Sequence, residues 1–269
     1  MPVNPPIRHP DFPSRNIPPR EVDVWLPPGY AGGSAHYPVL YMHDGQNLFA
    51  SVIPTGKTPW RVDEALAELV DSGEARAAII VGIWNSGERW REYAPEKPMA
   101  RVKDPAARAR FTERAGGISS SGRYLAFLVD ELKPFIDAEY RTLTGRADTI
   151  VLGSSMGGLI SLYAISEYPE VFGGAGCVST HWPAGGNELV NAMADGLPDP
   201  ASHRLYFDYG TETLDAAYEP FQLQMDARLT TAGYARGANW LTMKFEGAAH
   251  NEESWSKRVD LPLRFLLGP

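Results

Sequence analysis

The fold is decided by the stretch Thr149-Ile-Val-Leu-Gly-Ser-Ser155-Met-Gly-Gly-Leu159, in which an apolar strand passes through a tight turn into a helix. Residues 153–157 match the pattern G-x-S-x-G. The bare pattern is short and therefore weak, but the strand before it and the helix expected over 156–168 supply the setting that a nucleophile elbow requires. The lysine of a phosphate-binding loop and a G-x-G-x-x-G pattern are both absent from the stretch. The stretch thus predicts that Ser155 presents its hydroxyl on a strained turn.

Short apolar runs alternate with amphipathic segments along the rest of the chain. Strands are expected at 21–26, 38–42, 77–83, 149–152, 175–178, 204–208 and 241–245, and helices at 62–70, 124–136, 156–168, 217–232 and 251–267. Pro134 should kink the last turn of the second helix. Buried strands that alternate with amphipathic helices indicate an α/β fold with a mainly parallel central sheet and helices on both faces. We expect residues 1–269 to form a single domain.

Two segments stand outside this alternation. Residues 1–20 are rich in proline, arginine and asparagine, and they predict an irregular arm. Residues 84–121 form a connection too long for a plain link, which favours a lid-like insertion. From Ser86 to Arg114 the insertion carries eight Lys/Arg and five Asp/Glu, so its net charge is +3 and the remainder of the chain has −11. The insertion is expected to cover an active site and to favour substrates with an acidic group, although a solvated surface loop would have the same composition.

The composition limits the classes of partner. The net charge of −8 disfavours nucleic acids and anionic membranes. No window approaches 18 uninterrupted apolar residues, and the N-terminal residues do not resemble a secretory signal, so a cytoplasmic location is expected. The single cysteine, Cys177, cannot form an internal disulfide and is predicted to be a small core residue. The sequence does not predict the oligomeric state.

A serine hydroxyl needs a general base, and His250 is the best candidate. In hydrolases with a nucleophile elbow the order along the chain is serine, acid, histidine, and only His181, His203 and His250 follow Ser155. His250 lies on the loop between the last expected strand and the last helix, from which it could reach back over the sheet. His203 precedes a strand and so lies at the wrong end of the sheet, and His181 is better placed to line a pocket. The alternative for His250 is an ordinary surface histidine.

The acid that orients this base should follow the strand at 204–208. Asp208, Glu212 and Asp215 are candidates, and Asp208 at the end of the strand is more typical of a structural residue. We favour Asp215, because the loop must extend away from the sheet to reach the histidine, and keep Glu212 as the alternative acid. Each carboxylate could instead cap the helix that follows.

Two backbone N–H groups could hold an oxyanion. One is that of Met156, at the start of the helix after the serine. The other is that of Gln46, next to Gly45 on the loop after the strand at 38–42. The adjacent His43 and Asp44 could be read as metal ligands, but two neighbours without a distant partner make a poor site, so no metal is expected.

Aromatic side chains could line a substrate pocket near the serine. The candidates for substrate binding are Trp84, His181 and Trp182, with Trp90 and Tyr93 beside them. Each could equally be a packing residue, because aromatic side chains are common in cores.

The sequence resembles a known family at these motifs. The motifs are Leu40-Tyr-Met-His-Asp-Gly-Gln-Asn-Leu-Phe49, Gly153-Ser-Ser-Met-Gly-Gly158 and Gly247-Ala-Ala-His-Asn-Glu-Glu-Ser-Trp255, with smaller matches that extend over 22–267. They look like the putative esterase group, which includes enterochelin, feruloyl and acetyl-xylan esterases, esterase D and the mycolyltransferases. Some members have an aspartate three residues after the loop glycine, where this chain has Thr213, so the choice between Glu212 and Asp215 stays open.

The resemblance implies an α/β-hydrolase that acts on small-molecule carboxylic esters without a cofactor, through a serine–histidine pair. The expected reaction is hydrolysis through an acyl-enzyme on Ser155, with His250 as base and Asp215 as acid. Two alternatives remain at this point. One is acyl transfer to an alcohol by the same residues, and the other is a catalytically silent binding module on the same fold.

Overall fold

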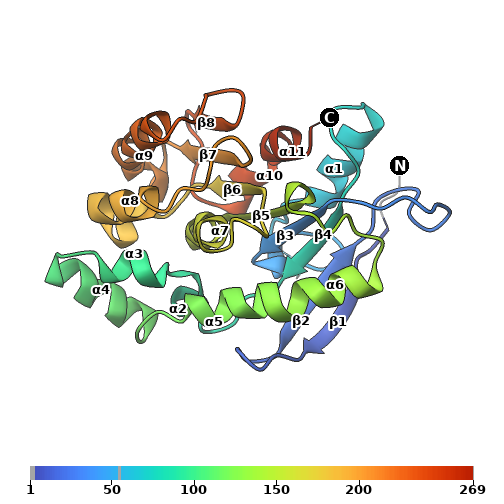
Figure 1. Ribbon diagram of the computed structural model, residues 1–269, viewed down its shortest axis with the longest axis horizontal. Coiled ribbons are helices and arrows are strands. Elements are labelled where there is room, and N and C mark those ends of the chain that lie inside the picture. Colours follow the sequence, from blue (N-terminus) through green and yellow to red (C-terminus); the bar gives the residue numbers. More distant parts are fainter. Residues whose placement is uncertain (1–3, 54–55, 269) are drawn as a thin grey trace.

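The computed structural model describes residues 4–53 and 56–268, and within them the chain builds one eight-stranded sheet in the order β1-β2-β4-β3-β5-β6-β7-β8 (Figure 1). The strands are β1 (Ile7–Phe12), β2 (Arg20–Trp25), β3 (Val39–His43), β4 (Ile79–Ile83), β5 (Thr149–Ser154), β6 (Gly174–Val178), β7 (Arg204–Gly210) and β8 (Trp240–Phe245). The pairs β1/β2 and β2/β4 are antiparallel, and every pair from β4 to β8 is parallel. The mainly parallel sheet is thus confirmed, with each of the seven expected strands within about two residues of its predicted position.

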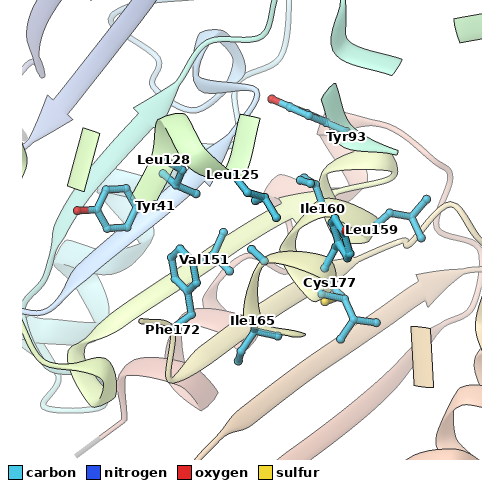
Figure 2. Close-up of a cluster of buried hydrophobic side chains, with 14 of the residues drawn as sticks. Tyr41, Tyr93, Leu125, Leu128, Val151, Leu159, Ile160, Ile165, Phe172 and Cys177 are labelled. Carbon is cyan, nitrogen blue, oxygen red and sulfur yellow. The ribbon is translucent and has the colours of Figure 1, made fainter. Parts of the chain in front are cut away.

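Helices cover both faces of the sheet. One buried cluster joins the sheet to α1 (Val62–Asp71), α10 (Glu252–Ser256) and α11 (Asp260–Leu267). The other joins it to α5 (Ser121–Ala126), α6 (Lys133–Glu139), α7 (Met156–Glu167), α8 (Gly186–Ala194) and α9 (Glu219–Thr231). Figure 2 shows this second cluster, in which Leu125 and Leu128 face Val151 of β5 and Ile160 of α7. Strands buried on both faces explain why β3, β4 and β5 are apolar runs with polar residues only at their ends.

The helix expected over 124–136 is longer than predicted, and it is distorted just before Pro134. It runs from α5 through a π-helical turn at Phe127–Leu132 into α6, where Pro134 stands in the first turn. Because the helix continues from α5, Pro134 offers no N–H donor to the preceding turn and its ring crowds that turn, and a π-helical turn is one way in which a helix adapts to this. The distortion therefore takes the form of a widened turn just before Pro134.

Two expectations about local structure need correction, and one helix was missed. The arm at 1–20 is not irregular throughout, because Ile7–Phe12 forms β1. Insertion 84–121 is largely helical, with α2 (Arg89–Tyr93), α3 (Glu96–Ala100) and α4 (Pro105–Ala115). Helix α8 was not predicted. The strand β1 escaped notice because Pro10 interrupts an exposed pattern, which an edge strand tolerates and an inner strand does not.

The single cysteine is a core residue, as the sequence predicted. Cys177 is buried in β6, where burial raises the pKa of its thiol, and Figure 2 shows it packed among aliphatic side chains. No helix within 4–53 and 56–268 is long and apolar enough to span a membrane.

Candidate active site

The candidate site lies at the carboxyl ends of the parallel strands, where four backbone positions are strained. Six non-glycine residues in the described chain have a positive φ, and four of them stand just after these strands: Asp44, Ser155, Ser179 and Thr213. Such conformations are costly and cluster at functional sites. Ser155 has φ 58° and ψ −119° between β5 and α7.

The glycines around Ser155 let the strand and the helix approach each other. A Cβ at Gly153 would lie 2.9 Å from the backbone of Gly157, and one at Gly158 would lie 2.8 Å from the hydroxyl of Thr180. Real Cβ atoms do not come this close, so the turn requires glycine at both positions. The sequence signal G-x-S-x-G-G therefore has a direct steric cause in this fold.

The backbone ties Ser155 to the segment after β6. Its N–H donates to the carbonyl oxygen of Val178 at 2.9 Å, and its carbonyl accepts the N–H of His181 at 3.1 Å. These two bonds fix the position of His181 beside the serine. They also explain why the residues after β6 contribute to the site although that strand carries no motif.

His250 and Asp215 form a short hydrogen bond. His250 lies between β8 and α10, and its Nδ1 is 2.5 Å from Oδ1 of Asp215, which lies in the 3-10 turn Thr213–Ala217. The N–H of His250 also donates to the hydroxyl of Thr213 at 2.8 Å. The side chain of Glu212, by contrast, is exposed. Of the two candidate acids, the structure thus brings Asp215 to His250.

The environment of Asp215 favours its ionised form. Its Oδ2 accepts hydrogen bonds from the hydroxyl of Ser179 at 2.6 Å and from the N–H of Gly210 at 2.7 Å. Burial acts to raise the pKa of this carboxyl, but the hydrogen bonds from His250, Ser179 and Gly210 outweigh burial and hold the pKa below its usual value. A buried carboxylate facing an imidazole N–H is the arrangement that orients a histidine base.

A second layer of buried polar groups holds Ser179. Its hydroxyl oxygen accepts from Trp255 Nε1 at 3.0 Å and from Arg258 Nη2 at 2.9 Å. Arg258 also forms a buried ion pair with Asp208 at 2.9 Å. Asp208 thus has the structural role that its position at the end of a strand suggested.

Tyr218 was not singled out in the sequence, yet it lies at the centre of the site. Its hydroxyl is 2.6 Å from Nδ1 of His181, and its ring meets that of His250 edge-on at 5.6 Å. Burial raises the pKa of the Tyr218 phenol, while an interaction with the hydroxyl of Ser155 acts to lower it. Tyr218 therefore links the serine, His181 and His250. The hydrogen bonds of the described residues do not include a direct one between Ser155 and His250.

The two predicted oxyanion donors lie on adjoining segments. Met156 is the first residue of α7, and Gln46 lies in the 3-10 turn Gly45–Asn47 after β3. A Cβ at Gly157 would lie 3.5 Å from Asp44, which shows how close this turn comes to the start of α7. Within the described chain, neither the N–H of Met156 nor that of Gln46 has a protein acceptor. Both are available to an incoming oxygen.

His43 and Asp44, which could be read as metal ligands in the sequence, form hydrogen bonds with other side chains in the structure. Asp44 accepts two bonds from Arg89 at 2.7 Å each and one from Asn85 at 2.6 Å. His43 contacts the hydroxyl of Tyr124 at 2.7 Å, and burial lowers the pKa of His43 to about 3. Within the residues that the structure describes, no three His, Cys, Asp or Glu side chains are arranged to hold a metal ion.

The predicted substrate residues have different surroundings. His181 borders the site, and burial lowers its pKa to about 4, so its imidazole is neutral at pH 7. Trp182 is only 1% exposed, stacks on Phe207 and donates to Gln222, which places it in the core. Trp84 donates to Asp23 at 2.7 Å and lies near the antiparallel edge of the sheet.

The insertion reaches the site through Trp90 and not through Trp84. Trp90 of α2 meets the ring of His181 edge-on at 5.6 Å, and Phe111 of α4 lies 6.3 Å from Trp90. The pair Asp44–Arg89 fixes the start of the insertion to the turn that carries Gln46. The insertion therefore forms one wall of the site. Whether it moves as a lid stays a prediction.

A family model and a curated relative match nearly the whole chain. The family described as "Putative esterase" matches residues 18–260. The uncharacterized protein YbbA of Bacillus subtilis is 26% identical over 256 residues, which cover 93% of each chain.

Solved structures with a similar fold carry hydrolase names. An IroE-like serine hydrolase from Shewanella oneidensis superposes with a TM-score of 0.75 at 22% identity, covering 97% of this chain and 79% of that one. The enterobactin esterase FES from Shigella flexneri has a TM-score of 0.70 at 20% identity, with 98% of this chain and 60% of FES covered. The ferulic acid esterase AmCE1/Fae1A from Anaeromyces mucronatus has a TM-score of 0.64 at 19% identity, with 98% and 91% covered.

Proposed function

The chain belongs to the putative esterase family and is an ester-hydrolysing enzyme of the α/β-hydrolase fold, and we propose that it cleaves carboxylic esters through an acyl intermediate on Ser155. The observations that carry this proposal are the strained Ser155 turn and, at the same carboxyl end of the sheet, a histidine whose Nδ1 is held by a buried carboxylate. Free backbone N–H groups at the start of α7 and after β3 support it.

The reaction proceeds in two halves in this proposal. His250 Nε2 takes the proton of the Ser155 hydroxyl as its oxygen adds to the ester carbonyl carbon. The N–H groups of Met156 and Gln46 bind the negative oxygen of the tetrahedral intermediate. When the intermediate collapses, the carbon–oxygen bond to the alcohol breaks and His250 donates its proton to that alcohol. A water molecule then adds to the acyl-enzyme in the same way, which releases the acid and restores the serine.

Asp215 and Tyr218 position the reacting groups. Asp215 accepts the Nδ1 proton of His250, which leaves Nε2 unprotonated towards the serine and stabilises the imidazolium formed during attack. Because His181 is neutral, its Nδ1 can form a hydrogen bond with the Tyr218 hydroxyl without adding a competing positive charge. Tyr218 thereby keeps a polar group next to the Ser155 oxygen in an otherwise buried wall.

The decisive experiment replaces the serine and a matched neighbour. Ser155→Ala should lower turnover of p-nitrophenyl acetate by several orders of magnitude, because the nucleophile is lost. Ser154→Ala removes the same atom from the adjacent buried residue of β5 and should retain activity. Near-wild-type hydrolysis by folded Ser155→Ala would refute the proposal.

A further inference from the structure

Arg114 is a positively charged residue beside the site, and none of the described residues gives it a carboxylate partner. Most cations of insertion 84–121 are paired, as Arg89 is with Asp44 and Arg101 with Asp195. Within the described residues, no carboxylate oxygen lies within 4.0 Å of the Arg114 guanidinium. The net positive charge that the sequence assigns to the insertion therefore includes a free charge at this point.

The guanidinium is held against the aromatic wall of the site. Its central carbon lies 4.2 Å from the ring centroid of Trp90, whose edge meets His181 at 5.6 Å. His181 in turn contacts the hydroxyl of Tyr218 next to Ser155. An arginine stacked on an aromatic face keeps the N–H groups of its planar edge available to an in-plane acceptor. Arg114, which is exposed, thus lies against Trp90, and Trp90, His181 and Tyr218 lead from it to the serine.

Other charges near the site do not cancel this one. Asp44 and Arg89 form a bidentate pair, and Asp215 is occupied by His250. Burial is the main reason for the low pKa of His181, and the positive charges of His250, Arg114 and Arg89 act in the same direction. A substrate group of negative charge placed on the Trp90 side would meet attraction there.

We infer that Arg114, stacked on Trp90, forms a subsite for an anionic group of the ester substrate, with a carboxylate as the simplest ligand. A carboxylate matches the planar donor edge of the guanidinium and can accept two N–H bonds from it. The anion can belong to either half of the ester, and the two halves require different probes. This inference rests on the proposed function, because it names the class of ester that Ser155 would cleave.

The test compares matched esters on matched variants. For the acyl half, p-nitrophenyl hydrogen succinate is compared with p-nitrophenyl butyrate, and for the alcohol half, 4-acetoxybenzoate with phenyl acetate. Arg114→Gln should lower kcat/KM about tenfold for at least one anionic ester and leave its neutral partner within about twofold, since one charged hydrogen-bonded contact is lost. Arg110→Gln removes the same charge from the same helix, but from an arginine that faces Asp104 at 3.9 Å, and should change neither. Equal effects of Arg114→Gln on anionic and neutral esters would overturn the inference.

A binding measurement separates this inference from the proposed function. Monomethyl succinate and 4-acetoxybenzoate are titrated calorimetrically into Ser155→Ala with and without Arg114→Gln. We expect one ligand to bind about tenfold more weakly to the double variant. This loss without ester turnover by the wild type would retain the anion subsite and refute the esterase mechanism. Unchanged binding of both ligands would refute the subsite even if the esters are hydrolysed.

Discussion

Asp215→Asn should cripple the enzyme while it leaves the fold intact. The carboxylate is 1% exposed and has distinct partners on its two oxygens. Oδ2 accepts two donors, the hydroxyl of Ser179 and the N–H of Gly210, whereas Oδ1 faces His250. In an asparagine at this position, we expect the amide oxygen to take the place of Oδ2, where it can accept both hydrogen bonds. The opposite orientation would point the NH₂ group, which is a donor, at two other donors.

The amide NH₂ must then face Nδ1 of His250. An N–H donor at this position requires Nδ1 to be unprotonated, so the proton of the neutral imidazole moves to Nε2. Nε2 can then no longer accept the proton of Ser155. The loss of the correct tautomer and of the charge that stabilises the imidazolium predicts a decrease in kcat of about 10³- to 10⁴-fold, with KM little changed.

The assay is hydrolysis of p-nitrophenyl acetate at about pH 7.5 by proteins whose thermal unfolding shows that they are folded. Glu212→Gln is the matched control, because the side chain of Glu212 is exposed and lies three residues away on the same loop. It should retain wild-type kcat. An Asp215→Asn variant within about tenfold of wild type, or a crippled Glu212→Gln, would refute the assignment of the acid.

Three further predictions concern the site and its surroundings. Tyr218→Phe should lower kcat about tenfold with an unchanged fold, since only the hydroxyl beside His181 and Ser155 is removed; unchanged kcat would deny it a positioning role. Burial raises the pKa of Asp63 to about 6, so ionisation of this carboxyl lowers the free energy of unfolding. The loss is absent below about pH 4, where the carboxyl is protonated in both states, and complete above about pH 6. Asp63→Asn should therefore raise the Tm by a few degrees at pH 8 and leave it unchanged at pH 4; equal shifts at both pH values would contradict this. Dialysis against EDTA should leave turnover unchanged, and a loss restored by zinc or calcium would contradict a metal-free mechanism.

The sequence predicted the sheet because its inner strands are buried on both faces. Residues 39–43, 79–83 and 149–154 are buried throughout, so they are apolar except at their ends and stand out from the amphipathic helices between them. The edge strand β1 has no such signal, because most of its residues are exposed. The short helices of insertion 84–121 were missed for a related reason, since five-residue helices such as α2 and α3 show too little periodicity to detect.

The residues of the site differ in how much local signal they carry. Ser155 could be predicted from the sequence because its strained turn requires glycine on both sides. Tyr218 was not, because its role depends on where a helix start meets the segment after β6, and this contact joins residues 37 positions apart. Trp182 was one of the aromatic residues expected to line a pocket, but the turn at Trp182–Ala184 directs its ring to Phe207 and Gln222.

The most direct test of the central claim is to trap the covalent intermediate. The protein is incubated with a fluorophosphonate, which reacts with an activated serine, and is then digested and sequenced by tandem mass spectrometry. The account predicts that the phosphonyl group is found on Ser155, that labelling abolishes hydrolysis in proportion, and that Ser155→Ala and Asp215→Asn are labelled far more slowly than Ser154→Ala. Labelling of a different residue, or full hydrolysis by protein whose Ser155 is modified, would contradict it.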